Sequence, residues 1–229
     1  MDYLRQFWVV SAKDLRAEFR TKEAINASLA FALVILVLFS FAFDAADLEV
    51  AAMNEISGGL LWIAFAFAGT LVLNRSFVRE LPNDCLDGLI AAPISRSALF
   101  LGKAFANFAL VLAVELVSLP VFGIFYHVRW ARQAPELMLV LVLGTWGVTV
   151  IGTITSALTV NIKLREVMLP MLTYPILVPA LMSAMQLTTK LMAGEAIGED
   201  TMLWLKMLIG FDVIYTAVSL LLIEVVLIG

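Results

Sequence analysis

Two carboxyl side chains stand inside long apolar stretches of this sequence. Glu115 lies midway along the stretch 104–125, and Asp212 lies about two turns into the stretch that begins at Leu203. An ionisable side chain at the centre of a membrane costs at least ~2.5–3.5 kcal/mol, so each carboxyl group needs a reason to be there. The structural hypothesis is a protonated carboxyl group bonded to a neighbouring helix. The functional hypothesis is a group that lines a polar path or binds a partner subunit.

Other residue patterns that support chemistry are incomplete. The phosphate-binding pattern G-x-x-x-x-G-K-[ST] does not occur, since Gly102-Lys103 lacks both the upstream glycine and the following Ser or Thr. The sole histidine, His127, has no C-x-x-C-H motif and is interpreted as a residue of the membrane rim. Residues 87–91 are similar to the start of the CDP-alcohol phosphotransferase signature, but Ala92 replaces its arginine and no G-x-x-x-D-x-x-x-D follows. We therefore expect no catalytic residues, no metal site and no directly bound cofactor.

The composition of the chain is that of an integral membrane protein, so membrane-spanning helices must position these groups. Of 229 residues, 62% are hydrophobic and 15% are charged, and the mean hydropathy is +0.98. The net charge of -4 gives no reason to expect a nucleic-acid partner. A bilayer core of about 30 Å needs roughly 20 helical residues to cross it. Six runs of that kind predict an all-α transmembrane protein with a single domain over residues 1–229, the spans being 24–43, 56–73, 104–125, 137–160, 167–187 and 203–228.

Two of these runs carry features that bear on helix packing. In the fifth, prolines interrupt the hydrogen-bond ladder and predict a kinked or broken helix, at Pro170, Pro175 and Pro179. In the fourth, small and hydroxyl-bearing residues share one face and predict a helix-packing stripe rather than a substrate site: Thr145, Thr149, Gly152 and Ser156.

Lysine and arginine residues gather on one side of the predicted membrane. Eleven lie in the N-terminal segment and in the second and fourth gaps, against three in the gaps on the other side. The first gap, residues 44–55, holds acidic residues and no basic ones. The positive-inside rule therefore places both termini in the cytoplasm.

Residues 1–23 are predicted to form an amphipathic helix before the first span. One face is apolar, with Leu4, Trp8, Leu15 and Phe19. The opposite side is basic, with Arg5, Lys13, Arg16 and Arg20. Such a helix lies in the membrane interface with its cations facing anionic headgroups. It either anchors the chain or acts as an elbow that packs on the transport core and moves with it.

The second gap, residues 74–103, is the longest and contains a further amphipathic pattern. Apolar residues recur every four positions and define one helical face, at Phe77, Leu81, Cys85 and Leu89. Polar residues face elsewhere, and Pro93 ends the helix at Ala92. This segment is either a helix that docks on a partner or a solvated loop with an interfacial helix. The candidate docking residues are Phe77, Arg79, Glu80, Leu81, Asp84, Asp87, Gly88 and Leu89.

A series of short motifs runs through most of the chain in a fixed order. They are GLLWIA at 59–64, RSF at 75–77, Asp84, DG at 87–88, AP at 92–93, LGK at 101–103, LGT at 143–145, ALTV at 157–160, LP at 169–170, PI at 175–176 and VP at 178–179. The ordered set resembles the haem exporter protein B family, the permease subunit of the system I cytochrome c maturation transporter. Two departures are Asn26-Ala27, where the family commonly has Asn-Pro, and Leu89-Ile90, where it tends to have an acidic residue.

The resemblance implies an ABC-2-type permease in the bacterial inner membrane, without ATPase activity of its own. Implied partners are a dimeric ABC ATPase that docks on residues 79–93, and a second copy of the chain or a related permease. A Trp-rich membrane subunit that handles haem and a periplasmic haem chaperone are also implied. ATP would act through the ATPase, and haem is the candidate substrate, either exported or released as a loaded chaperone. Two alternatives remain open: an ABC-2-type permease for a drug, lipid or polysaccharide, and a scaffold subunit without its own translocation path.

Overall fold

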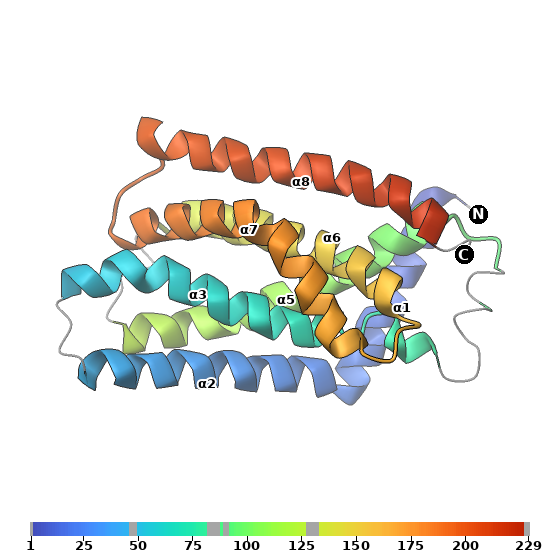
Figure 1. Ribbon diagram of the computed structural model, residues 1–229, viewed down its shortest axis with the longest axis horizontal. Coiled ribbons are helices and arrows are strands. Elements are labelled where there is room, and N and C mark those ends of the chain that lie inside the picture. Colours follow the sequence, from blue (N-terminus) through green and yellow to red (C-terminus); the bar gives the residue numbers. More distant parts are fainter. Residues whose placement is uncertain (1, 46–49, 82–87, 89–91, 127–132, 227–229) are drawn as a thin grey trace.

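The computed structural model describes residues 2–45, 50–81, 88, 92–126 and 133–226, and its regular structure is helical (Figure 1). The helices, with a short 3-10 helix η1 among them, are α1 (Tyr3–Thr21), α2 (Glu23–Ala45), α3 (Val50–Leu73), η1 (Val78–Glu80), α5 (Arg96–Phe125), α6 (Ala134–Thr159), α7 (Arg165–Met192) and α8 (Glu199–Val226).

The long helices are assembled into one bundle. Six of them, α2, α3 and α5 to α8, are long and apolar enough to cross a membrane, which confirms the predicted all-α transmembrane architecture. They run side by side along the long axis of the molecule, and both chain termini lie at the same end of the bundle (Figure 1). We call this end the terminal end and the opposite end the far end.

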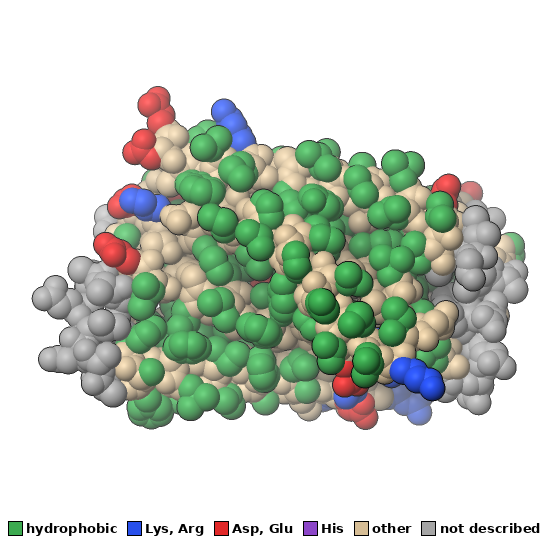
Figure 2. Space-filling view, in the orientation of Figure 1, with side chains coloured by type: hydrophobic (Ala, Val, Ile, Leu, Met, Phe, Trp, Pro, Cys, Tyr) green, Lys and Arg blue, Asp and Glu red, His purple; other side chains and the backbone are tan. Residues whose placement is uncertain are grey.

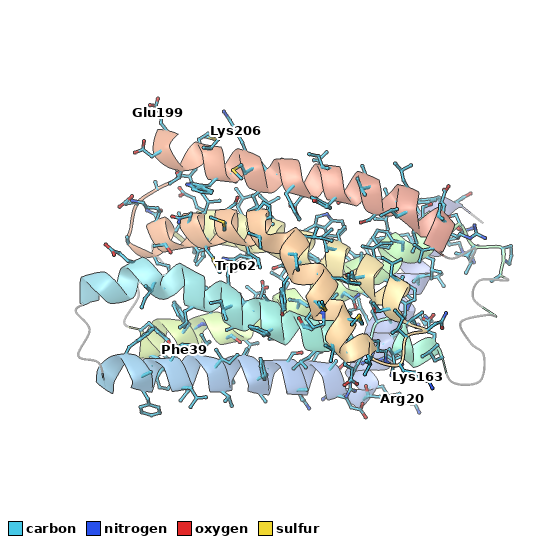
Figure 3. All side chains as sticks on the ribbon, viewed as in Figure 1. Arg20, Phe39, Trp62, Lys163, Glu199 and Lys206 are labelled. Atoms are coloured by element: carbon cyan, nitrogen blue, oxygen red, sulfur yellow. The ribbon has the colours of Figure 1, made fainter. Side chains whose placement is uncertain are left out.

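Close contacts between α3, α6 and α7 form the centre of the bundle. Trp62 of α3 is fully buried and lies against Gly144 of α6, where an added Cβ would stand 2.1 Å from the ring (Figure 3). Its indole Nε1 donates to Thr188 Oγ1 of α7 at 2.9 Å. About two turns further along α6, an added Cβ at Gly152 would lie 2.3 Å from the Leu73 side chain. Glycine at both positions is what lets α3 approach α6.

The predicted stripe on α6 lies inside the protein. All four of its members are buried: Thr145, Thr149, Gly152 and Ser156. The hydroxyl of Thr149 is satisfied within its own helix, because it donates to the Thr145 carbonyl at 2.8 Å. This arrangement allows polar side chains to line a helix interface without an unpaired group.

Helix α7 runs without interruption through three prolines. It is helical from Arg165 to Met192, with Pro170, Pro175 and Pro179 inside. Figure 1 shows that it changes direction along its length, so the helix is bent and not broken.

The outer surface of the bundle matches a lipid environment. Hydrophobic side chains cover the face shown in Figure 2, and charged side chains gather near its two ends. Large apolar residues of α2, α7 and α8 are exposed, including Leu38, Met171 and Leu221. A soluble protein does not expose apolar surface on this scale.

The largest difference from a predicted boundary is at the start of α5. Helix α5 begins at Arg96, whereas the predicted span began at residue 104. Ser95 is the physical reason, because its Oγ accepts from the Ala98 amide at 3.3 Å and so caps the helix. Residues 96–103 therefore belong to the bundle and not to the second gap, and Lys103 lies inside the protein.

Candidate functional site

Helix α1 packs on the first turns of α5 through a face that mixes polar and apolar residues. This face repeats every four residues: Gln6, Val10, Asp14 and Glu18. Three members of the predicted apolar face, Leu4, Trp8 and Phe19, are exposed. The fourth, Leu15, is half-buried and packs on the bundle. An inner polar face and an outer apolar face suit a helix at a membrane surface, since lipid can cover the outer one.

The contact between α1 and α5 is close. Ser11 Oγ donates to the Gly102 carbonyl of α5 at 3.0 Å. An added Cβ at Gly102 would stand 2.8 Å from Val10 Cβ, so glycine is required for this approach. The helix is therefore packed on the bundle, as the elbow hypothesis expected.

Lys103 of α5 is a buried cation at the centre of the contact between α1, α5 and the residues that follow α3, which we call the junction. Its side chain is 1% exposed. The Nζ atom donates to Glu80 Oε1 at 2.6 Å, to the Ser76 carbonyl at 2.9 Å and to Asp14 Oδ2 at 3.1 Å. It also lies 4.8 Å from the centroid of the Phe77 ring. All three ammonium donors are thus used, and two carboxylates balance the charge that burial would otherwise penalise.

A second lysine completes the charge balance. Lys13 of α1 donates to Glu80 Oε1 and lies 3.1 Å from Asp14 Oδ1. Burial by itself would lower the pKa of Lys13, but the negative charges of Asp14 and Glu80 outweigh it and raise that pKa above its ordinary value. Lys13 is therefore charged at neutral pH, and two cations face two carboxylates.

Glu18 joins α1 to the start of α2. Its side chain is fully buried, and Oε1 accepts from the amides of Ala24 and Ile25 at 2.7 and 2.9 Å. The other oxygen accepts from Arg79, just before residues 81–92, which we call the loop for brevity only. A carboxylate at a helix N-terminus satisfies free amides and is favoured by the helix dipole. Lys22, with φ at 57°, makes the left-handed turn that brings α2 back over Glu18.

Helix α1 also forms hydrogen bonds to the residues directly after this loop. Gln6 Oε1 accepts from the Ser95 amide at 3.0 Å and from its hydroxyl at 3.2 Å, and Gln6 Nε2 donates to the Pro93 carbonyl at 3.4 Å. Residues of α1 thus bond to the chain on both sides of the loop. Lys13 and Glu18 bond to residues before it, and Gln6 bonds to residues after it. We call Gln6, Lys13 and Glu18 the α1 clamp.

Polar contacts continue from the junction into the bundle. Asn107 Nδ2 lies 2.9 Å from Ser76 Oγ and 2.9 Å from Thr153 Oγ1, which links α5 to the end of α3 and to α6. Deeper in, Glu115 is 2% exposed and accepts from Thr145 Oγ1 at 2.6 Å. The bond to a neighbouring helix that the structural hypothesis expected for Glu115 is present.

Asp212 of α8 is buried in a different setting. It is 6% exposed, and neither of its carboxylate oxygens has a hydrogen-bond partner among the described residues. It lies against Gly147 of α6, where an added Cβ would stand 2.8 Å from Oδ1. Within the described part of the chain, no group of three or more His, Cys, Asp or Glu residues is placed to hold a metal ion.

The predicted docking residues divide into three groups. Phe77 and Glu80 are buried in the junction, so their assignment to an exposed docking surface is wrong. The physical reason is Lys103, whose buried charge needs Glu80 as a partner and packs on the Phe77 ring. Arg79 is paired with Glu18, and Leu81 packs against the buried cluster around Val10 and Phe77. Asp84, Asp87 and Leu89 lie outside the described residues.

The end of the docking segment is partly described. The Ala92 amide donates to the Gly88 carbonyl at 3.1 Å, a hydrogen bond of helical spacing directly before Pro93.

Sequence reasoning missed the residues that hold the junction together. These are Gln6, Asp14, Glu18, Ser76, Lys103 and Asn107. A signal for the α1 residues was available, because Gln6, Asp14 and Glu18 share a four-residue spacing with Val10. No local pattern identifies Lys103 as buried, because its partners come from α1 and from the segment after α3.

Comparisons with known proteins place the chain among transporter components. The family model described as "CcmB protein" matches residues 5–225. The Rhodobacter capsulatus protein named Heme exporter protein B is 32% identical over 81% of this chain and 84% of its own length. The proteins of that name from Paracoccus denitrificans and Pseudomonas aeruginosa are 28% and 29% identical, over 80% and 76% of this chain and 82% and 77% of theirs.

Proposed function

The chain belongs to the CcmB protein family, and we propose that it is the permease subunit through which a separate ABC ATPase drives cytochrome c maturation. The ATPase seats on the part of residues 79–93 that lies outside the junction, and moves it. A second copy of the chain or a related permease fills the other site of a dimeric ATPase. A Trp-rich haem-handling subunit and a periplasmic haem chaperone complete the complex.

The observation that carries this proposal is the α1 clamp. The loop 81–92 is bonded to α1 on both of its sides, at Arg79 and Glu80 before it and at Pro93 and Ser95 after it. Lys103 of α5 shares Glu80 with α1. A force on the loop is therefore passed to α1 and α5 together.

The energetic reason is the burial of the charges. Separating one partner of a buried ion pair from the other costs about 3–5 kcal/mol, because the remaining charge is left without a counterion in a low dielectric. Moving the loop alone would break the contacts of Glu80 and Arg79. Moving the loop, α1 and the first turns of α5 as one body keeps them, so it is the less costly response.

The same proposal gives the orientation of the chain in the membrane and the effect of the motion on haem. The terminal end faces the cytoplasm, because it carries the excess of lysine and arginine. The motion either moves haem through the membrane or releases a haem-loaded chaperone from the complex. We favour release, because the sequence has a single histidine, His127, and no motif that attaches haem.

The test separates recruitment of the ATPase from coupling to it. Leu89→Asp puts a charge on the apolar face of the docking helix and should abolish pull-down of the ATPase and the yield of c-type cytochromes. Gln6→Leu keeps the side-chain volume but removes the bonds to Ser95 and Pro93, so it should keep pull-down and reduce the cytochrome yield.

Asp84→Ala serves as the control, because the sequence pattern places this charge off the apolar face, where a solvated charge contributes about 0–1 kcal/mol, and recruitment should be retained. Normal ATPase pull-down with Leu89→Asp would show that this segment is not the docking element. Normal cytochrome yield with Gln6→Leu would show that α1 does not transmit the motion.

A further inference from the structure

A charged cleft lies at the terminal end, beside the junction described above, and shares Arg79 with it. Its volume is about 590 Å³. The turn between α1 and α2, the end of α3 with the residues after it, and the start of α7 form its walls. Three arginines line it, Arg75, Arg79 and Arg165, together with apolar side chains that include Ala27 and Leu71. A site with cations and apolar walls suits a ligand that has a charged head and an apolar body.

The cleft lies at the level where the spans end. Helix α2 begins at Glu23, α3 ends at Leu73 and α7 begins at Arg165, all at the terminal end. On the membrane side of the cleft, α2 exposes Phe31 and α7 exposes Val167. Figure 2 shows charged side chains gathered beside the hydrophobic band in this part of the molecule. This is the depth at which lipid headgroups and the first carbons of acyl chains meet a protein.

Arg165 is the arginine of the cleft that is available to an anion. Arg75 is paired with Glu23 and Arg79 with Glu18, so each of these two pairs is neutral. Within the part of the chain that the structure describes, no acidic side chain forms an ion pair with Arg165, although Glu166 also lines the cleft. The planar guanidinium group binds phosphate through two parallel N–H bonds, which a lysine cannot do.

Two further features support the same ligand. Arg20, in the last turn of α1, and Lys163, just before α7, lie at the same end of the molecule (Figure 3). The N-terminus of α7 forms part of the cleft wall, and its helix dipole adds partial positive charge beside Arg165.

We propose that this cleft is a binding site for an anionic phospholipid such as phosphatidylglycerol. The phosphate binds Arg165 and Arg75, and the acyl chains follow the exposed apolar side chains of α2 and α7. The inference does not depend on coupling to an ATPase. It explains why arginine lines a cleft at a membrane surface.

The test measures lipid retention by the purified full chain. Protein in mild detergent is mixed with phosphatidylglycerol or with zwitterionic phosphatidylcholine, and bound lipids are counted by native mass spectrometry. Wild type should retain phosphatidylglycerol in preference to phosphatidylcholine. Arg75→Gln/Arg165→Gln should bind it about thirtyfold more weakly, because each interfacial arginine contributes about fivefold to the affinity for an anionic lipid. Arg165→Lys should retain part of the binding.

The matched control is Arg5→Gln, which removes an exposed arginine of α1 outside the cleft. Its phosphatidylglycerol binding should equal that of wild type, and an equal loss in both variants would overturn the proposal in favour of general surface attraction. Inorganic phosphate at millimolar concentration should not displace the lipid; full displacement would show a free-phosphate site instead. If the double variant binds lipid normally but no longer binds the ATPase, the cleft is a protein contact and the lipid proposal is wrong.

Discussion

Removal of the buried Lys103 charge tests the physical basis of the junction. In Lys103→Met the side chain keeps a similar length and loses the ammonium group. Glu80 Oε1 then loses its 2.6 Å contact, and Asp14 loses its 3.1 Å contact. Lys13 remains near both carboxylates and offsets part of the loss.

The expected magnitude follows from the burial of the partners. Lys103 is 1% exposed and the Glu80 side chain is 8% exposed, so solvent screens this pair very little. Removing one partner of such a pair costs about 3–5 kcal/mol, and the remaining Lys13 contact places the expected loss at the lower end. Lys103→Met/Glu80→Gln removes the unbalanced charge, so the double variant should return to within about 1 kcal/mol of wild type.

The measurement is equilibrium unfolding in mixed detergent micelles, followed by tryptophan fluorescence. The control is Lys206→Met, the same substitution at an exposed position of α8 at the far end (Figure 3), which should leave stability unchanged. A Lys103→Met variant as stable as wild type would refute the reasoning, because it would mean that these charges are not held in a low dielectric. A double variant that loses the sum of the single effects would refute the ion-pair explanation and indicate a packing defect.

Three further predictions concern the bundle and its orientation. Glu115→Gln should keep assembly and cytochrome c maturation near normal, because the amide oxygen still accepts the hydroxyl hydrogen bond that Glu115 accepts; full assembly with lost maturation, measured as c-type cytochrome yield, would instead assign Glu115 to a polar pathway. Cys85 should react with a membrane-impermeant thiol reagent in inside-out vesicles and not in intact cells, and labelling from outside would reverse the proposed orientation. Gly144→Ala should destabilise the protein by about 1–3 kcal/mol through overpacking, because an added Cβ would lie 2.1 Å from a buried ring. Gly59→Ala is its control in the same unfolding assay, since nothing lies within 4 Å of an added Cβ there.

Much of the architecture could be predicted from the sequence. Each transmembrane helix needs about 20 apolar residues in succession, and such a run can be recognised from the local sequence alone. The helices α2, α3, α6, α7 and α8 therefore lie where the apolar runs predicted them. The beginning of α5 was missed because Arg96 and Lys103 interrupt the hydropathy, although Ser95 is a recognisable helix cap.

The candidate site could be predicted only in part. Periodicity identified the segment near residue 80 as important, and the ordered motifs identified the family. Periodicity also assigned Phe77 and Glu80 to an exposed surface, because a repeat of four residues shows that side chains share a face but not what that face contacts.

By itself, the sequence determined the class of protein, the number of spans and the side on which basic residues gather, because these depend on local composition and length. The tertiary structure decided which charges are buried and paired. Lys103, Glu80 and Asp14 come from three separate places in the chain, and each is tolerated inside the protein because the others lie within hydrogen-bond reach or share a partner. Such mutual compensation is a property of the three-dimensional contact and cannot be read from any one segment.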